Sequence, residues 1–338
     1  MFNRIEIKGN YYEIGYQLGS LFKQAIKNNI SLFEAKLNNI TISNIIDKNI
    51  ESIKYRLPNC YEELIGKAEA AGVEFRPLFL MHSPEILDKV DGCTTAIIKK
   101  KDCVLFSHNE DDKGYDHTNT ALVKIIKENG DWLVSLAAYD KLVGSCFGYN
   151  SFGLVFSCNF IYHESVNTDY LSRYLVIRDA VESKSIDECF NKFINIPTAS
   201  PFSFNVLEKE SLKVLNIEND YENHNVTNID YKYARSNHFL TKDNPKMSVS
   251  SKNRNLNAKK RIEPLDNDSS IYDLIDVLSL ENENPDDCIL KDPNKFNNPK
   301  VALTICNFSY DTKTNLILIN DYIDHTFISM DYDEFQAD

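Results

Sequence analysis

The hydrophobic pattern of this 338-residue chain changes from a helical to a strand-like period after Cys93. Before that residue, apolar side chains recur every three or four positions, which predicts an amphipathic helix from about residue 11 to residue 36 and another at 61–71. A shorter helical piece at 78–82 lies between two prolines. Residues 1–92 are therefore predicted to be mainly helical.

Short runs of strand-forming residues follow Cys93, and turn residues separate them. The Asn129-Gly130 dipeptide between two such runs is a strong hairpin signal. Strands are predicted at 94–99, 103–108, 120–127, 131–139, 152–159, 202–208, 212–218, 301–309, 313–319 and 326–330. Helices are predicted at 169–182, 186–194 and 271–280. This order indicates an α+β fold of two stacked antiparallel sheets with helices outside them, whereas periodicity alone supports only a mixed α and β fold that is largely antiparallel.

The net charge of −13 argues against nucleic acid as the main partner, because phosphate binding needs a basic face. There is no apolar run of about 18 residues, so no transmembrane helix is predicted. The first residues lack the apolar core of a secretory signal, and the eight cysteines are spread singly without a C-x-x-C pair. We therefore expect a cytoplasmic protein with free thiols.

Cys93 is the first candidate for chemistry. A lone cysteine is more often a small buried hydrophobe than a nucleophile, but its neighbours here favour the second role. Gly92 allows the backbone geometry needed for attack on the preceding carbonyl, and Thr94 starts a strand. A hairpin of two such strands is expected to return Asp111, 18 residues later, to the neighbourhood of Cys93.

These features together describe an N-terminal nucleophile. In such a site Cys93 breaks the Gly92–Cys93 bond, and the new α-amine, which ordinarily titrates near ~8, becomes the general base. An oxyanion hole then needs backbone N–H groups or amide side chains. Asn159 at a strand end and Asn237 after a turn are candidates, although such asparagines are more often turn formers or caps.

The same residues carry a resemblance to a known family. The motifs are Gly92-Cys93-Thr94, Asn109-Glu110-Asp111, residues 148–159 and Arg235-Ser236-Asn237-His238-Phe239. In this order they resemble the acyl-coenzyme A:6-aminopenicillanic acid acyltransferase-like family of self-processing Ntn-hydrolases. The resemblance implies a four-layer αββα sandwich of two antiparallel sheets flanked by helices. It also implies cleavage into residues 1–92, the α chain, and 93–338, the β chain, which together form one globular unit.

Roles for four residues follow from this resemblance. Cys93 is implied as the nucleophile, and Asp111 is implied to orient the thiol or the α-amine. Asn159 and Asn237 are implied to bind the amine or the oxyanion. No cofactor and no metal are expected.

Several positions depart from the family's pattern. Glu110 lies where the family usually has an aromatic residue. We expect Glu110 and Asp112 to face solvent; the alternative is that they favour a cationic substrate. Asn307 lies where the penicillin enzyme of the family has a basic residue, so penicillin chemistry is not expected. His108 is expected to be a hydrogen-bonded structural histidine.

The segment 241–261 contains seven Lys or Arg against one Asp. We expect a solvated loop leading into a helix, and the alternative is a rim that receives an anionic substrate or coenzyme.

The predicted function is cleavage or formation of a linear amide bond of a small-molecule N-acyl amide through a Cys93 thioester. Hydrolysis is favoured over transfer to an amine or from an acyl-CoA, because no coenzyme A site is recognisable. A homo-oligomer is compatible with the sequence.

Three alternatives stay open. In the first, the chain is an unprocessed, non-catalytic protein of the same fold that binds a small ligand. In the second, it is a thiol hydrolase that pairs Cys93 with His108 or His238. The third is a zinc site of Cys93, Cys103 and His108, whose spacing matches no usual ligand pattern.

Overall fold

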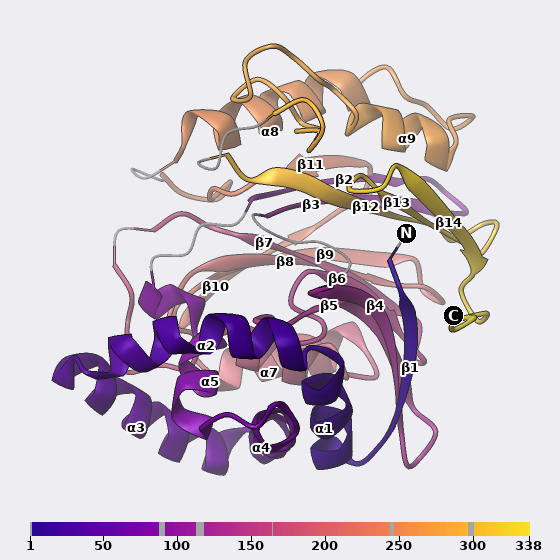
Figure 1. Cartoon of the computed structure of the whole chain (residues 1–338). Coiled ribbons are helices and arrows are strands. Elements are labelled where there is room, and N and C mark those ends of the chain that lie inside the picture. The colour runs from indigo at the N-terminus through magenta and orange to yellow at the C-terminus, as the bar shows by residue number, and fades with distance from the viewer. Residues whose placement is uncertain (1, 88–91, 113–117, 164, 244–246, 297–300) are drawn as a thin grey trace.

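The computed structural model describes residues 2–87, 92–112, 118–163, 165–243, 247–296 and 301–338. In this part of the chain two β-sheets lie face to face, and helices cover the outer face of each sheet (Figure 1). The predicted four-layer αββα sandwich is confirmed. No helix among the described residues combines the length and apolar character needed to cross a membrane.

The lower sheet of Figure 1 has the strand order β1-β4-β5-β6-β7-β8-β9-β10. Its strands pair antiparallel except for β1 and β4, which are parallel. The bounds are β1 (Arg4–Gly9), β4 (Thr120–Lys127), β5 (Trp132–Ala138), β6 (Phe147–Asn150), β7 (Leu154–Phe160), β8 (Phe202–Glu208), β9 (Lys213–Asp220) and β10 (Asn223–Asn228). The hairpin predicted at Asn129-Gly130 joins β4 to β5 and is confirmed.

The upper sheet has the order β11-β2-β3-β12-β13-β14, and all of its pairs are antiparallel. The bounds are β2 (Gly92–Lys99), β3 (Val104–Asp112), β11 (Lys232–Arg235), β12 (Leu303–Asp311), β13 (Leu316–Asp321) and β14 (Thr326–Asp331). Two helices cover its outer face, α8 (Val249–Ile262) and α9 (Ile271–Val277) (Figure 1).

The remaining helices lie beneath the lower sheet (Figure 1). They are α1 (Tyr11–Leu21), α2 (Lys23–Leu37), α3 (Ile40–Arg56), α4 (Pro58–Ala71), α5 (Phe75–Met81), the 3-10 turn η1 (Pro84–Leu87), α6 (Arg173–Ala180) and α7 (Ile186–Asn195). α1 and α4 pack so closely that a Cβ at Gly15 would lie 1.8 Å from the carbonyl oxygen of Glu63. Glycine is therefore required at this crossing.

The N-terminal segment departs from its predicted structure in three places. Residues 4–9 form β1, because the short Ile5–Ile7 alternation pairs with β4. The helix predicted from residue 11 to 36 is broken at Phe22 into α1 and α2, and α3 was not predicted. The division of the chain into residues 1–92 and 93–338 stays a prediction.

The hairpin of β2 and β3 is longer than predicted, and its register decides the geometry of the site. Gly92 pairs with Asp111, and Cys93 pairs with Glu110. Because side chains alternate along a strand, the residue opposite Cys93 shares its face and Asp111 lies on the other. β2 has a neighbour on each side, so Cys93 lies at the end of an inner strand and not at a lateral edge of the sheet.

Candidate active site

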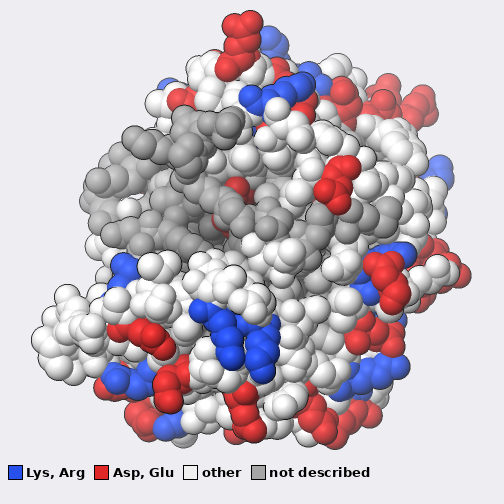
Figure 2. All heavy atoms as spheres, in the orientation of Figure 1, with Lys and Arg blue, Asp and Glu red and all other residues white. Residues whose placement is uncertain are grey.

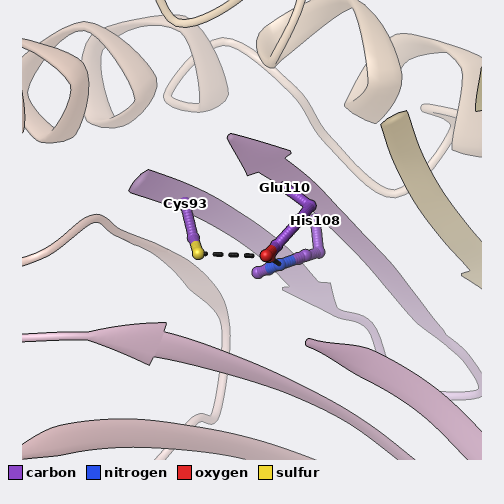
Figure 3. A group of neighbouring side chains, drawn as sticks. All are labelled: Cys93, His108 and Glu110. Carbon is purple, nitrogen blue, oxygen red and sulfur yellow. Dashed lines mark hydrogen bonds and ion pairs between the residues drawn. The ribbon is translucent and has the colours of Figure 1, made fainter. Parts of the chain in front are cut away.

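Cys93 is the second residue of β2, and its side chain lies on the face of the hairpin that bears Glu110 and His108 (Figure 3). The side chain is buried, and its Sγ donates a hydrogen bond to Oε2 of Glu110 at 3.3 Å. The backbone N–H of Cys93 donates to Oδ1 of Asn237 at 2.9 Å, and its carbonyl oxygen accepts from Arg254 at 2.5 Å. The amide, the thiol and the carbonyl of one residue are thus each held by a side chain.

Asn237 follows β11 and lies beside the backbone of Cys93. Its Oδ1 accepts from Cys93 and from Arg254, the latter at 2.7 Å. Its Nδ2 donates to the carbonyl oxygen of Phe160 at 2.8 Å, and its backbone N–H donates to Ser251. Asn237 therefore connects the end of β2 to the end of β7.

Arg254 was not predicted as a site residue. It lies on α8, is 2% exposed, and donates to the carbonyl of Cys93, to Thr94 at 2.8 Å and to Asn237. The basic segment was expected to be a solvated loop leading into a helix, and the helical part is confirmed. The apolar Ala258 and Ile262 lie four and eight residues after Arg254, and this helical spacing is a signal that it faces inward.

Asp111 lies on the outer face of the hairpin. Its Oδ2 accepts from Lys291 at 2.9 Å and its Oδ1 accepts from Thr304 at 2.7 Å. A Cβ at Gly92 would lie 2.9 Å from Oδ2, so the carboxylate approaches the backbone before Cys93 and not the thiol. Burial lowers the pKa of Lys291, and the Asp111 carboxylate opposes that shift.

Asn159, at the end of β7, lies between the two sheets. Its Oδ1 accepts from Thr95 and from Asn205, each at 2.9 Å. Its Nδ2 is buried and has no hydrogen-bond partner among the described residues. A buried donor without a partner costs about 1–3 kcal/mol, so this amide is suited to bind an oxyanion or another acceptor.

The expectation that Glu110 and Asp112 face solvent was wrong, because both carboxylates are buried against Lys141. The Lys141 ammonium lies 2.7 Å from Oε1 of Glu110 and 2.5 Å from Oδ2 of Asp112. Burial raises the pKa of Glu110, but Lys141 and His108 outweigh it and hold the value at about 2. Burial lowers the pKa of Lys141, and Asp112 and Glu110 raise it well above its ordinary value.

The two histidines have different surroundings. His108 is fully buried and contacts Thr95 at 2.8 Å and Glu110 at 3.3 Å, so its predicted hydrogen bonding is confirmed. His238 contacts Ser251 at 2.8 Å, and burial together with Arg235 lowers its pKa to about 4.

Cys103 precedes β3 at the opposite end of the hairpin from Cys93, about 20 Å away at strand spacing. This separation excludes the alternative zinc site of Cys93, Cys103 and His108.

A small pocket with room for about one water molecule lies beside the thiol. It is lined by Cys93, Glu110, Lys141, Ser145, Cys158, Phe160, Arg173 and Tyr174. Figure 2 shows the surface hollowed between the two halves of the sandwich, with acidic side-chain atoms visible inside the hollow. On the face shown in Figure 2, acidic and basic side chains are intermixed.

The chain is similar in sequence to a known family and to curated proteins. A sequence profile of the acyl-coenzyme A:6-aminopenicillanic acid acyl-transferase family matches residues 98–319. The chain is 30% identical over 212 residues to the beta-alanyl-dopamine/carcinine hydrolase of Drosophila melanogaster, covering 54% of each chain. It is 24% identical over 203 residues to the 40 kDa form of acyl-coenzyme A:6-aminopenicillanic-acid-acyltransferase of Emericella nidulans, covering 56% of each. The chain thus spans about half the length of these curated relatives.

Two solved structures are also similar. A variant of conjugated bile acid hydrolase from Clostridium perfringens superposes with a TM-score of 0.45 and 14% identity, over 71% of this chain and 92% of that one. Penicillin V acylase from Agrobacterium tumefaciens superposes with a TM-score of 0.47 and 10% identity, over 71% of this chain and 86% of that one.

Proposed function

Because the chain belongs to the acyl-coenzyme A:6-aminopenicillanic acid acyl-transferase family, as its motifs predicted, we propose that it hydrolyses a linear amide bond of a small N-acyl compound. The reaction proceeds through a thioester on Cys93. The observation that carries the proposal is the arrangement of Cys93 itself. Its thiol lines a pocket while Asn237 and Arg254 hold its amide and its carbonyl.

Maturation precedes this reaction. The Sγ of Cys93 attacks the carbonyl carbon of Gly92, the Gly92–Cys93 peptide bond breaks, and water hydrolyses the resulting thioester. The freed nitrogen becomes the α-amine of Cys93. Two contacts support this step: Oδ1 of Asn237 already accepts from that nitrogen, and Asp111 lies beside Gly92.

In the mature enzyme the α-amine takes the proton of the thiol as Sγ attacks the substrate carbonyl. The tetrahedral intermediate collapses when the amine of the substrate leaves with that proton. Water then releases the acyl group from Sγ. The unpaired Nδ2 of Asn159 supplies a donor for the oxyanion, and such a donor typically contributes 10²–10³ in kcat, about 3–4 kcal/mol.

The proposed substrate class is a β-alanyl amide, and it rests on the name of the fly relative, a hydrolase of beta-alanyl-dopamine and carcinine. The lining of the pocket does not select the charge of the acyl group, because Lys141 is paired with Glu110 and the Arg173 guanidinium lies over the rings of Phe160 and Tyr174. Water is the proposed acceptor; an amine or an acyl-CoA as co-substrate is the alternative.

The test is a substrate screen on the purified protein with β-alanyl amides, other N-acyl amino acids and penicillins. The proposal expects release of a free amine from the β-alanyl amides, at a rate that falls after alkylation of Cys93. Release of amine that is insensitive to alkylation contradicts the Cys93 thioester. A protein that stays in one piece and binds these compounds without cleaving them supports the non-catalytic alternative.

A further inference from the structure

Three buried side chains converge on one point at the site, and they are of the types that bind zinc (Figure 3). Oε2 of Glu110 lies 3.3 Å from Sγ of Cys93 and 3.3 Å from Nε2 of His108. All three ligand atoms lie within 4.8 Å of one another. Neighbouring ligands of a tetrahedral zinc ion, with bonds of about 2.0–2.3 Å, are about 3.3–3.5 Å apart. The site therefore has nearly the ligand spacing of such a centre.

The hydrogen bonds around His108 direct its Nε2 into this cluster. Oδ1 of Asn159 can only accept, so the hydroxyl hydrogen of Thr95 goes to Asn159. Oγ1 of Thr95 then accepts from Nδ1 of His108, at 2.8 Å. Nδ1 is therefore a donor, and Nε2 is the ring nitrogen that faces the carboxylate of Glu110.

A chain of amides fixes the orientation of Asn159. Arg235, which can only donate, binds Oδ1 of Asn216 at 3.1 Å. Nδ2 of Asn216 then donates to Oδ1 of Asn205 at 2.8 Å, and Nδ2 of Asn205 donates to Oδ1 of Asn159 at 2.9 Å. The direction of the Nδ1 hydrogen bond of His108 thus follows from Arg235 on β11, the strand that pairs with β2. A histidine that ligates a metal is normally held in this way, with its other ring N–H bound to an oxygen.

The charges around the cluster do not by themselves select a divalent cation. With the thiol ionised by the metal, Cys93, Glu110 and Asp112 contribute three negative charges. The adjacent Lys141 ammonium, the Arg254 guanidinium on the carbonyl of Cys93 and a zinc ion contribute four positive charges. Arg173, which lines the same pocket, is itself paired with Glu85 at 3.2 Å.

We propose that Zn²⁺ binds Cys93, His108 and Glu110 and holds the thiol in an inactive state. Thiolate and imidazole ligands select zinc over the hard cations. The fourth position of the ion faces the pocket, where it excludes substrate. The metal site stands on geometry alone, whereas its inhibitory effect rests on the proposed function.

The test titrates chelator-treated full-length protein with Co²⁺, which reports a thiolate ligand by a near-ultraviolet charge-transfer band and tetrahedral geometry by visible bands. One equivalent is expected to bind, and Zn²⁺ is expected to remove both signals. His108→Ala and Glu110→Gln are expected to lose the visible bands. Cys103→Ser, which changes a thiol at the far end of the hairpin, is expected to keep them. Thr95→Val leaves all three ligands in place and is expected to weaken binding about 10–100-fold.

The outcomes separate the two proposals. An unchanged spectrum on adding Co²⁺, or a spectrum that both ligand variants retain, overturns the zinc site whatever the activity. Cobalt bands in a protein that cleaves no amide leave the zinc site standing and overturn the proposed function. If circular dichroism shows that His108→Ala does not fold, the cobalt spectra of the isosteric variants Glu110→Gln and Thr95→Val decide whether the zinc site exists. Where amide hydrolysis is found, Zn²⁺ is expected to inhibit it and EDTA to restore it.

Discussion

The backbone N–H of Cys93 donates to the side-chain oxygen of Asn237, 144 residues later in the sequence. The same oxygen accepts from Arg254, which also binds the carbonyl of Cys93. Asn237 therefore holds the peptide unit before Cys93, Arg254 holds the peptide unit after it, and both side chains come from outside the hairpin. This arrangement holds the Gly92–Cys93 bond in place relative to the nucleophile that is proposed to break it.

Replacing Asn237 by Ala is expected to slow maturation and to destabilise the fold by about 1–3 kcal/mol, because the amide of Cys93 loses its acceptor. Intact-mass spectra over time give the uncut fraction, and urea unfolding gives the stability. Arg254→Lys is a second test variant, since it keeps the positive charge but loses the planar guanidinium that binds two acceptors at once. Normal maturation in Asn237→Ala would remove Asn237 from the proposed mechanism.

Wild-type protein is expected to appear as two pieces, of 92 residues and of the remaining 246 of the 338. Cys93→Ala is expected to remain one folded chain without amidase activity, because the attacking atom is absent. Mass spectrometry and circular dichroism measure both properties. Cleavage after residue 92 in Cys93→Ala would show that another protease makes the cut.

Asn159→Ala is expected to lower kcat by about 10²–10³ while KM changes little, because its free Nδ2 serves the transition state and not the bound substrate. Steady-state kinetics on the matured fraction separate the two constants. Asn159→Asp is the matched variant, since it keeps an oxygen for Thr95 and Asn205 but has no N–H to donate, and it is expected to lose kcat as Asn159→Ala does. A kcat near that of the wild type in Asn159→Asp would remove this donor from the mechanism.

A buried ionic network is expected to keep the two pieces together and to weaken in acid. Arg178 binds Glu63 at 2.8 Å and Glu182 at 2.7 Å, and Tyr11 donates to Glu182 at 2.6 Å, so residues before and after Cys93 are joined. Burial raises the pKa of Glu182, but Arg178 and Lys127 outweigh it and hold the value at about 2.

Because this folded-state pKa lies below the ordinary 4.5, ionised Glu182 stabilises the fold above about pH 4.5, and that stabilisation is lost as the pH falls toward 2. Glu182→Gln is expected to cost on the order of 3 kcal/mol at pH 7 and progressively less below pH 4.5. Urea unfolding of both proteins across this range measures the difference. A cost that does not depend on pH would mean that packing, and not charge, explains the effect.

Much of the fold follows from local sequence. The change in period after Cys93 marks the boundary between a helical segment and paired strands, and hydrophobic burial explains why such periods are informative. The break at Phe22 and the strand at residues 4–9 were not predicted. The apolar period continues through Phe22, so the pattern alone shows one helix and not two. A short alternating run forms a strand only where another strand, here β4, offers it hydrogen bonds.

The sequence by itself identified Cys93 and the two asparagines as candidates, because a nucleophile after glycine and amides at strand ends are local patterns. Only the tertiary structure decided which groups meet at the thiol. The register of one hairpin places Glu110 beside Sγ and Asp111 beside Gly92, and a shift of one residue would exchange them. Arg254 and Lys141 reach the site from distant segments, and burial turns their charges from solvated groups into the partners that fix the geometry around Gly92-Cys93.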